Sequence, residues 1–143
     1  MRKFKNPFSR KLTTDNFTNL VGVQTVVRGD VFFNGVLKIE GVVNGNIEGN
    51  GPSTKSGFDE CLIVDAVGLV ESDTIKAANV VIAGDVKAKK IVALGTLRVM
   101  NTATITGAEI SYKNLEIEPG ARLHDCHLLH NSHAETDISE PAA

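Results

Sequence analysis

Short runs of alternating apolar residues recur between Leu37 and Leu128. Each unit starts with two apolar residues separated by one other. The starting pairs are Leu37/Ile39, Leu62/Val64, Val80/Ile82, Leu97/Val99 and Leu115/Ile117, and the steps between them are nearly equal except for a longer first one. A second apolar anchor and then a third follow within each unit. The second anchors are Val43, Val70, Val86, Ile105 and Leu123, and the third anchors are Ile47, Ile75, Ile91, Ile110 and Leu128. With a half unit at residues 27–31, the pattern predicts three short strands per unit, repeated about six times.

Alternation within a strand places one side chain inward and the next outward. The outward positions are largely polar: Lys38, Asn44, Asn46, Asp85, Lys87, Arg98, Thr104, Thr106 and Glu116. One such unit cannot bury its apolar side chains alone, but stacked units can, because each strand pairs with its equivalent one turn further on. We therefore predict an all-β fold, a single-stranded parallel β-helix that is triangular. The pattern leaves its handedness open, although right-handed crossovers are the general rule. The alternative, an antiparallel sandwich, predicts regularly spaced short strands but no three-part register.

The repeated unit resembles those of the bactofilins, a family of bacterial polymer-forming cytoskeletal proteins. The segments that carry the resemblance are residues 37–47, residues 80–86 and the ending at residues 115–121. The resemblance covers residues 22–128 and is interrupted at residues 48–60. It implies a right-handed β-helix that polymerises end to end without nucleotide. It also implies a scaffold that positions cell-envelope enzymes and membrane proteins.

The repeat predicts one folded domain with two tails. The expected division is a basic-aromatic N-terminal tail and lead-in at 1–21, a β-helix domain at 22–128 with a loop insertion at 48–60, and a C-terminal tail at 129–143. The tails are expected to be disordered. The insertion follows from the long step between Leu37 and Leu62, and its composition is typical of a loop that bulges outward at a corner. In the lead-in, Phe17 or Leu20 is a candidate cap for the open end of the column.

Neither end of the predicted stack carries an amphipathic capping helix. An open terminal coil offers unpaired backbone groups and rows of apolar side chains, which favours association with another chain. We therefore predict that the protein binds further copies of itself and forms a homopolymer. The candidate polymerisation residues are Val27 and Val31 at one end, and Leu115, Ile117, Leu123 and Leu128 at the other.

The N-terminal segment differs in charge from the rest of the chain. Residues 1–12 contain five basic residues and no acidic ones, and because the whole chain has a net charge of −2, the remainder carries −7. The segment is either a solvated tail or a peripheral anchor on an anionic membrane, and the resemblance to bactofilins favours the anchor. The candidate membrane-binding residues are Arg2, Lys3, Phe4, Lys5, Phe8, Arg10 and Lys11.

Composition bears on the partners and on the compartment. The net charge of −2, the absence of Trp and the single Tyr112 argue against nucleic acid as the primary partner. Cys61 and Cys126 lie in different units and are expected to be reduced thiols. There is no apolar run long enough for a transmembrane helix and no apolar block typical of a signal peptide. These features predict a cytoplasmic protein. The resemblance to the bactofilins further implies a cytoskeletal protein at the periphery of the cytoplasmic membrane that binds envelope or peptidoglycan-modifying proteins.

Candidate chemistry is sparse. His124, His127, His130 and His133 follow one another at intervals of three, but this spacing alternates between the two faces of a strand, so the cluster leaves metal binding open. The alternative function is a β-helix enzyme of the hexapeptide acyltransferase or γ-carbonic anhydrase type. A strict six-residue step is missing, however, and no histidine precedes residue 124 to act as the base. We expect no catalytic, cofactor or metal site.

Overall fold

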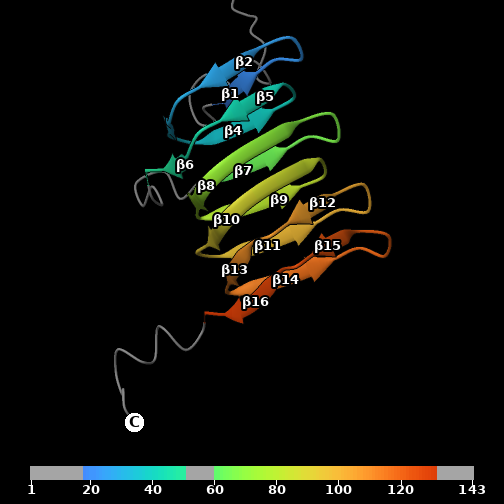
Figure 1. The fold of residues 1–143 in the computed structure, drawn as a ribbon. Coiled ribbons are helices and arrows are strands. Elements are labelled where there is room, and N and C mark those ends of the chain that lie inside the picture. The colour runs from blue at the N-terminus through green and yellow to red at the C-terminus, as the bar shows by residue number, and fades with distance from the viewer. Residues whose placement is uncertain (1–17, 51–59, 132–143) are drawn as a thin grey trace, which may run out of the picture.

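The computed structural model describes residues 18–50 and 60–131, and these form sixteen β-strands stacked as six successive coils (Figure 1). Every strand pairing is parallel, and each strand lies beside its equivalent in the next coil. The predicted parallel β-helix is therefore confirmed, and each coil contributes to three faces. The predicted tails lie largely outside the described residues.

The first face is a six-stranded sheet in which the strands follow one another coil by coil. Its strands are β1 (Thr18–Val21), β4 (Val36–Ile39), β7 (Cys61–Val64), β9 (Asn79–Ile82), β11 (Thr96–Val99) and β14 (Asn114–Ile117). Strand β1 pairs with β4 along its whole length, so the first coil begins at residue 18. The boundary predicted at residue 22 was therefore four residues too late.

The second and third faces share two long strands. The second face contains β2 (Val26–Arg28), β5 (Val42–Asn44), β12 (Thr104–Thr106) and β15 (Arg122–His124), and the third contains β3 (Val31–Phe33), β6 (Ile47–Gly49), β13 (Glu109–Tyr112) and β16 (His127–His130). In the third and fourth coils, β8 (Leu69–Ala77) and β10 (Asp85–Ala93) run through both faces. Strand β16 extends to residue 130, two residues past the predicted end of the domain.

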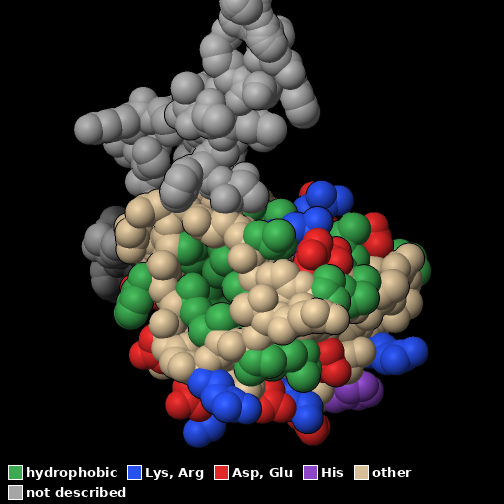
Figure 2. Space-filling model, turned by 90° about the horizontal axis from the view of Figure 1, so that it is seen from above, with side chains coloured by type: hydrophobic (Ala, Val, Ile, Leu, Met, Phe, Trp, Pro, Cys, Tyr) green, Lys and Arg blue, Asp and Glu red, His purple; other side chains and the backbone are tan. Residues whose placement is uncertain are grey.

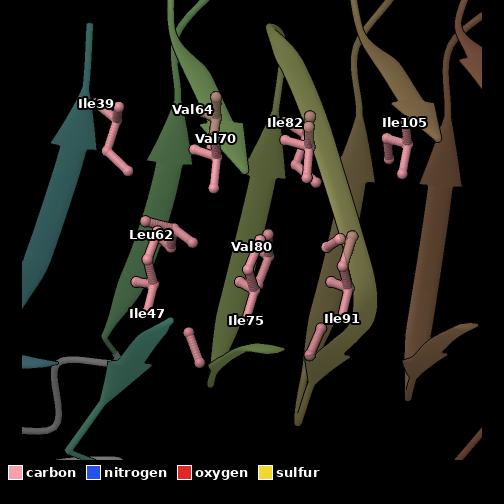
Figure 3. Close-up of a cluster of buried hydrophobic side chains, with 14 of the residues drawn as sticks. Ile39, Ile47, Leu62, Val64, Val70, Ile75, Val80, Ile82, Ile91 and Ile105 are labelled. Carbon is pink, nitrogen blue, oxygen red and sulfur yellow. The ribbon is translucent and has the colours of Figure 1, made fainter. Parts of the chain in front are cut away.

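The apolar anchors of each unit stack directly on their equivalents. The columns contain Leu37, Leu62, Val80, Leu97 and Leu115; Ile39, Val64, Ile82, Val99 and Ile117; Val27, Val43, Val70, Val86, Ile105 and Leu123; and Val31, Ile47, Ile75, Ile91, Ile110 and Leu128. All anchors of the third, fourth and fifth coils are 0% exposed. Figure 3 shows these aliphatic side chains in the space between the strands. The predicted three-part register is correct.

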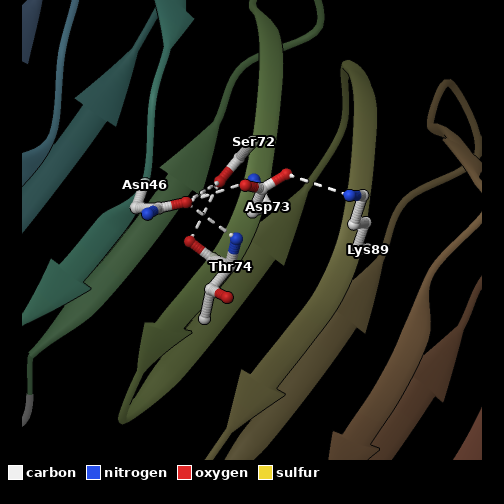
Figure 4. A network of polar contacts seen from close by, with 5 residues as sticks. All are labelled: Asn46, Ser72, Asp73, Thr74 and Lys89. Atoms are coloured by element: carbon white, nitrogen blue, oxygen red, sulfur yellow. Dashed lines mark hydrogen bonds and ion pairs between the residues drawn. The ribbon is translucent and has the colours of Figure 1, made fainter.

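The corner between the second and third faces is built in two ways. In the fifth and sixth coils, Gly107 and Asp125 occupy equivalent positions with φ of 73° and 56°, so the chain turns through the left-handed region that favours glycine. In the third coil the corner is stabilised by Asn46 of the coil before it. Its Oδ1 accepts the backbone N–H groups of Asp73 and Thr74 at 3.1 and 2.9 Å (Figure 4).

The predicted insertion at 48–60 is narrower in the structure, because Glu48 and Gly49 belong to β6 and Glu60 is buried. The Glu60 carboxylate accepts a hydrogen bond from the N–H of Ala78 at 3.2 Å. In a regular stack with this register, the acceptor for that N–H would be the carbonyl of Gly49. In the next coil the equivalent N–H, that of Leu94, donates to the Ala77 carbonyl at 3.0 Å. A Cβ at residue 49 would overlap the Glu60 carboxylate, so glycine leaves the space that this side chain fills.

Candidate functional site

The first coil presents one open end of the apolar columns. Val27 and Val31, two of the predicted polymerisation residues, are half-buried and pack against the core. Val21 and Phe33 also point into this coil and are 8% and 4% exposed. Figure 2 looks onto this end and shows apolar side chains gathered inside a ring of backbone and polar groups. Val21 was not among the predicted anchors, although it precedes Ile39 by the same interval that separates Val64 from Ile82.

A polar side chain interrupts the apolar column at this end. Asn19 lies opposite Leu37 in the register, so it occupies the position that leucine or valine takes in the later coils. Its Nδ2 donates to the carbonyl oxygens of Asn34 and Val36, at 3.0 and 3.2 Å. Asn19 breaks the apolar pair that marks every later unit, and the segment that forms β1 was predicted as part of the lead-in. Leu20, a predicted cap, points outward opposite Lys38 and is 60% exposed, while Phe17 lies outside the described residues.

The last coil presents the other open end. Leu115, Ile117, Leu123 and Leu128 continue the columns below Leu97, Val99, Ile105 and Ile110. Their equivalents in the fifth coil are 0% exposed, whereas Ile117 and Leu128 are 43% and 42% exposed. Leu115 and Leu123 are half-buried. The structure therefore brings the four candidates together on one terminal surface.

The backbone is also open at both ends. Within residues 18–50 and 60–131, strands β1, β2 and β3 pair only toward the second coil, and β14, β15 and β16 pair only toward the fifth. Each terminal coil thus offers strand edges with N–H and C=O groups directed along the axis. Such edges are templates for pairing with another chain, particularly where apolar side chains lie beside them.

Exposed apolar side chains are concentrated on the same two coils. Nine large hydrophobic residues are exposed among those described, and seven of them belong to the first or last coil or their corners: Leu20, Val23, Val26, Phe32, Ile117, Leu128 and Leu129. The other two, Val67 and Leu94, lie in the third and fourth coils. Ile117 and Leu128 lie on the terminal surface, and exposed apolar side chains of this kind are typical of an interface. Leu20, Val26, Phe32 and Leu129 occupy outward positions of their strands and face the sides of the terminal coils.

The candidate membrane-binding residues lie outside the described part of the chain. All seven, from Arg2 to Lys11, fall within residues 1–17. No helix among the described residues is long and apolar enough to cross a membrane.

Among the described residues, the ionisable side chains form no arrangement that is typical of a catalytic or metal site. Cys61 and Cys126 are free thiols. Burial, and then the nearby charge of Glu60, raise the pKa of the Cys61 thiol, which makes it less nucleophilic near neutral pH. Among the predicted histidines, the His130 ring bonds to the Lys113 carbonyl at 2.9 Å, and His133 lies outside the described residues. The residues that the structure describes contain no group of three His, Cys, Asp or Glu side chains placed to hold a metal.

On the sides of the stack, described residues line two hollows that are open to solvent. The larger, of about 650 Å³, follows the corner between the second and third faces and is bordered by Asp73, Lys87 and Lys89. The smaller, of about 530 Å³, lies on the third face beside Lys76 and Val92. Opposite charges are mixed along the larger hollow, and Lys89 pairs with Asp73 at 3.7 Å. The ends of the stack are therefore the better candidate for a functional surface.

Comparisons with known proteins identify the family of this chain. The sequence model of a family described as "Bactofilin", polymer-forming cytoskeletal, matches residues 19–126. A crystal structure of a mutant bactofilin from Thermus thermophilus is similar, with a TM-score of 0.58 and 33% identity over 71% of this chain and 98% of that one. A cryo-EM reconstruction of double helical filaments of Thermus thermophilus bactofilin has a TM-score of 0.57 and 27% identity over 77% of this chain and 98% of that one. No curated protein sequence matches the chain significantly.

Proposed function

Because this chain belongs to the bactofilin family of polymer-forming cytoskeletal proteins, we propose that it assembles end to end into filaments without nucleotide and that these filaments position cell-envelope or cell-shape proteins. The family match and the filament structure of a relative support the cytoskeletal role. In this proposal the main partner of the chain is another copy of itself.

The observation that carries the proposal is the open state of both ends. Ile117 and Leu128 are each more than two-fifths exposed, although their equivalents one coil earlier are fully buried. Covering such side chains with another copy contributes roughly 1 kcal/mol each through the hydrophobic effect. Pairing of the open strand edges adds backbone hydrogen bonds, and these give the contact a direction along the stack.

A charge placed inside the terminal surface tests the proposal. In β15, Leu123 points into the last coil and His124 points outward. We expect Leu123→Asp to abolish filaments, because assembly would bury an unpaired charge at a cost of several kcal/mol. His124→Asp places the same charge one residue away on the outer surface and should leave filaments intact. Electron microscopy and sedimentation of both variants measure the effect.

The results for the two variants and the unmodified protein distinguish end-to-end assembly from its absence. Loss of filaments in Leu123→Asp alone supports end-to-end assembly, provided that the variant unfolds in a cooperative transition. An unmodified protein that stays monomeric at high concentration contradicts the proposal.

We further propose that residues 1–12 hold the filament at the cytoplasmic membrane. Five basic residues contribute roughly 1 kcal/mol each near an anionic surface, and Phe4 and Phe8 add an apolar contribution. Sedimentation with anionic vesicles should show binding that weakens with added salt, because exposed charges are screened. A truncated chain that begins at Thr13 should lose vesicle binding and keep filament formation. Equal binding of the truncated and full chains contradicts this assignment.

The enzyme alternative, a hexapeptide acyltransferase or γ-carbonic anhydrase type of activity, gains no support from the described residues. The residues that line the two hollows include no histidine or cysteine, and the family is a structural one.

A further inference from the structure

The outer surface of the first face is apolar in the middle of the stack. Val36 and Cys61 lie opposite each other in the register, and so do Ile63 and Val81. All four side chains point away from the core and are half-exposed. We call these four residues, from β4, β7 and β9, the lateral patch (Figure 1).

The other two faces differ from the first at the same level. On the second face the outward residues of the third and fourth coils include Glu71 and Lys87, and on the third face they include Lys76 and Lys90. By contrast, β7 reads Cys-Leu-Ile-Val and β9 reads Asn-Val-Val-Ile, so both sides of these strands are apolar. Parallel strands with such sequences are typical of sheets that are covered on both sides.

The charges at the border of the lateral patch are paired within the chain. Lys38 lies next to Ile63 in the outward column and contacts Glu40 at 3.4 Å. Arg98 lies next to Val81 and contacts Glu116 at 2.8 Å. This border therefore shows little net charge. An anionic membrane or a strongly charged partner would find no attraction here, whereas an identical surface would meet no net repulsion.

We propose that the lateral patch is the contact through which two filaments of this protein run side by side. The inference rests on the proposed end-to-end assembly. A relative that is 27% identical forms double helical filaments, in which two strands must touch along their sides. Four half-exposed side chains make a small contact for two separate monomers. Along a filament the contact repeats at every subunit, and the repeats act together, so a weak contact is sufficient.

A pair of double variants tests the lateral patch. The first, Ile63→Lys with Val81→Lys, adds two charges to the patch. The control, Leu69→Lys with Val92→Lys, adds the same charges in the same two coils, at half-exposed outward positions of the second and third faces. Lysine keeps its charge in water at half-exposed positions, so both variants should fold. We expect single-stranded filaments from the first variant and paired strands from the control and the unmodified protein, as counted by electron microscopy.

Cys61 provides a second measurement, because it belongs to the lateral patch. Alkylation at mildly alkaline pH should be slower in unmodified filaments than in the single strands of the first variant or in monomeric Leu123→Asp. Paired strands in the first variant, or single strands in the unmodified protein, overturn the inference. The inference is also overturned if Cys61 is alkylated slowly in the monomer and faster once residues 1–12 are removed. That result would mean that residues 1–12, and not a second filament, cover the lateral patch. If no filaments form at all, the proposed function itself has failed.

Discussion

Ile91 and Leu128 belong to the same column of the third face, but they have different environments. Ile91 lies in the fourth coil, has a neighbour above and below in the column, and is 0% exposed. Leu128 lies in the last coil and is 42% exposed, and among the described residues it has a neighbour in the column on one side only. Both are large aliphatic residues on strands of similar pattern. Only the presence of another coil distinguishes them.

The comparison separates two roles that one repeated sequence unit performs. In the middle coils the inward side chains stabilise the monomer, because stacking buries them completely. In the terminal coils the same kind of side chain remains available for a second chain. Under the proposed end-to-end assembly, the same repeat supplies both the core and the contact surface, and the position of a unit in the stack decides which of the two it serves.

The largest expected effect is in the middle of the stack. Ile91→Ala should lower the free energy of unfolding by about 2–5 kcal/mol, because it removes buried methyl groups and leaves a cavity. Lys87→Ala, on an outward and exposed position of the same strand, should change it by less than about 0.5 kcal/mol. Denaturant melts in the monomeric Leu123→Asp background give both values. Equal destabilisation by the two variants would contradict the register described above.

A smaller effect should follow at the corner that leads into the third coil. Glu60→Ala removes the acceptor of the Ala78 N–H and should cost about 1–3 kcal/mol, because a buried donor loses its partner. Glu60→Gln keeps an acceptor of similar shape and should cost less. The same melts distinguish the two variants. If Glu60→Ala is as stable as the unmodified chain, the carboxylate does not hold this corner.

Substitutions in the last coil should destabilise the monomer less than substitutions in the middle of the stack. Leu128→Ala should cost roughly 1 kcal/mol in the monomer, because the leucine is buried only in part. Its effect on assembly should be larger, seen as a higher critical concentration for filament formation in sedimentation. A loss of monomer stability as great as that of Ile91→Ala would remove the distinction between the two regions.

The smallest effect is expected at the surface pair Lys89 and Asp73. The two side chains are 82% and 72% exposed, and such pairs contribute less than about 0.5 kcal/mol. Lys89→Ala should therefore leave the melting curve nearly unchanged, at low and at high salt. A marked loss of stability would show that this corner depends on charge as well as on Asn46.

The residues of the core could be predicted from the spacing of apolar residues along the chain alone. Every interior anchor, from Leu62 to Ile110, was assigned to the correct column, because each strand pairs with its equivalent one repeat later. The repeat period of the sequence therefore becomes the register of the stack. The same argument found the four candidate residues of the last coil. It found Val27 and Val31 in the first coil but missed β1, because Asn19 occupies an inward position there. The cost of burying Asn19 is offset by hydrogen bonds to backbone carbonyls that spacing does not reveal.

Other features depend on contacts between distant residues. Asn46 is 27 residues from the Asp73 N–H that it accepts, and Glu60 is 18 residues from Ala78. Neither hydrogen bond can be predicted from a local sequence pattern, because each joins residues in successive coils. Such a bond forms only where the complete coils stack and bring their corners together. The lateral patch could not be predicted from the local pattern either. In the sequence, each of its four residues is simply a further apolar residue in a strand, and nothing shows that they share one surface. Periodicity determines which side chains face the core of this protein, but only the stacking of complete coils places the remaining ones next to each other on its surface.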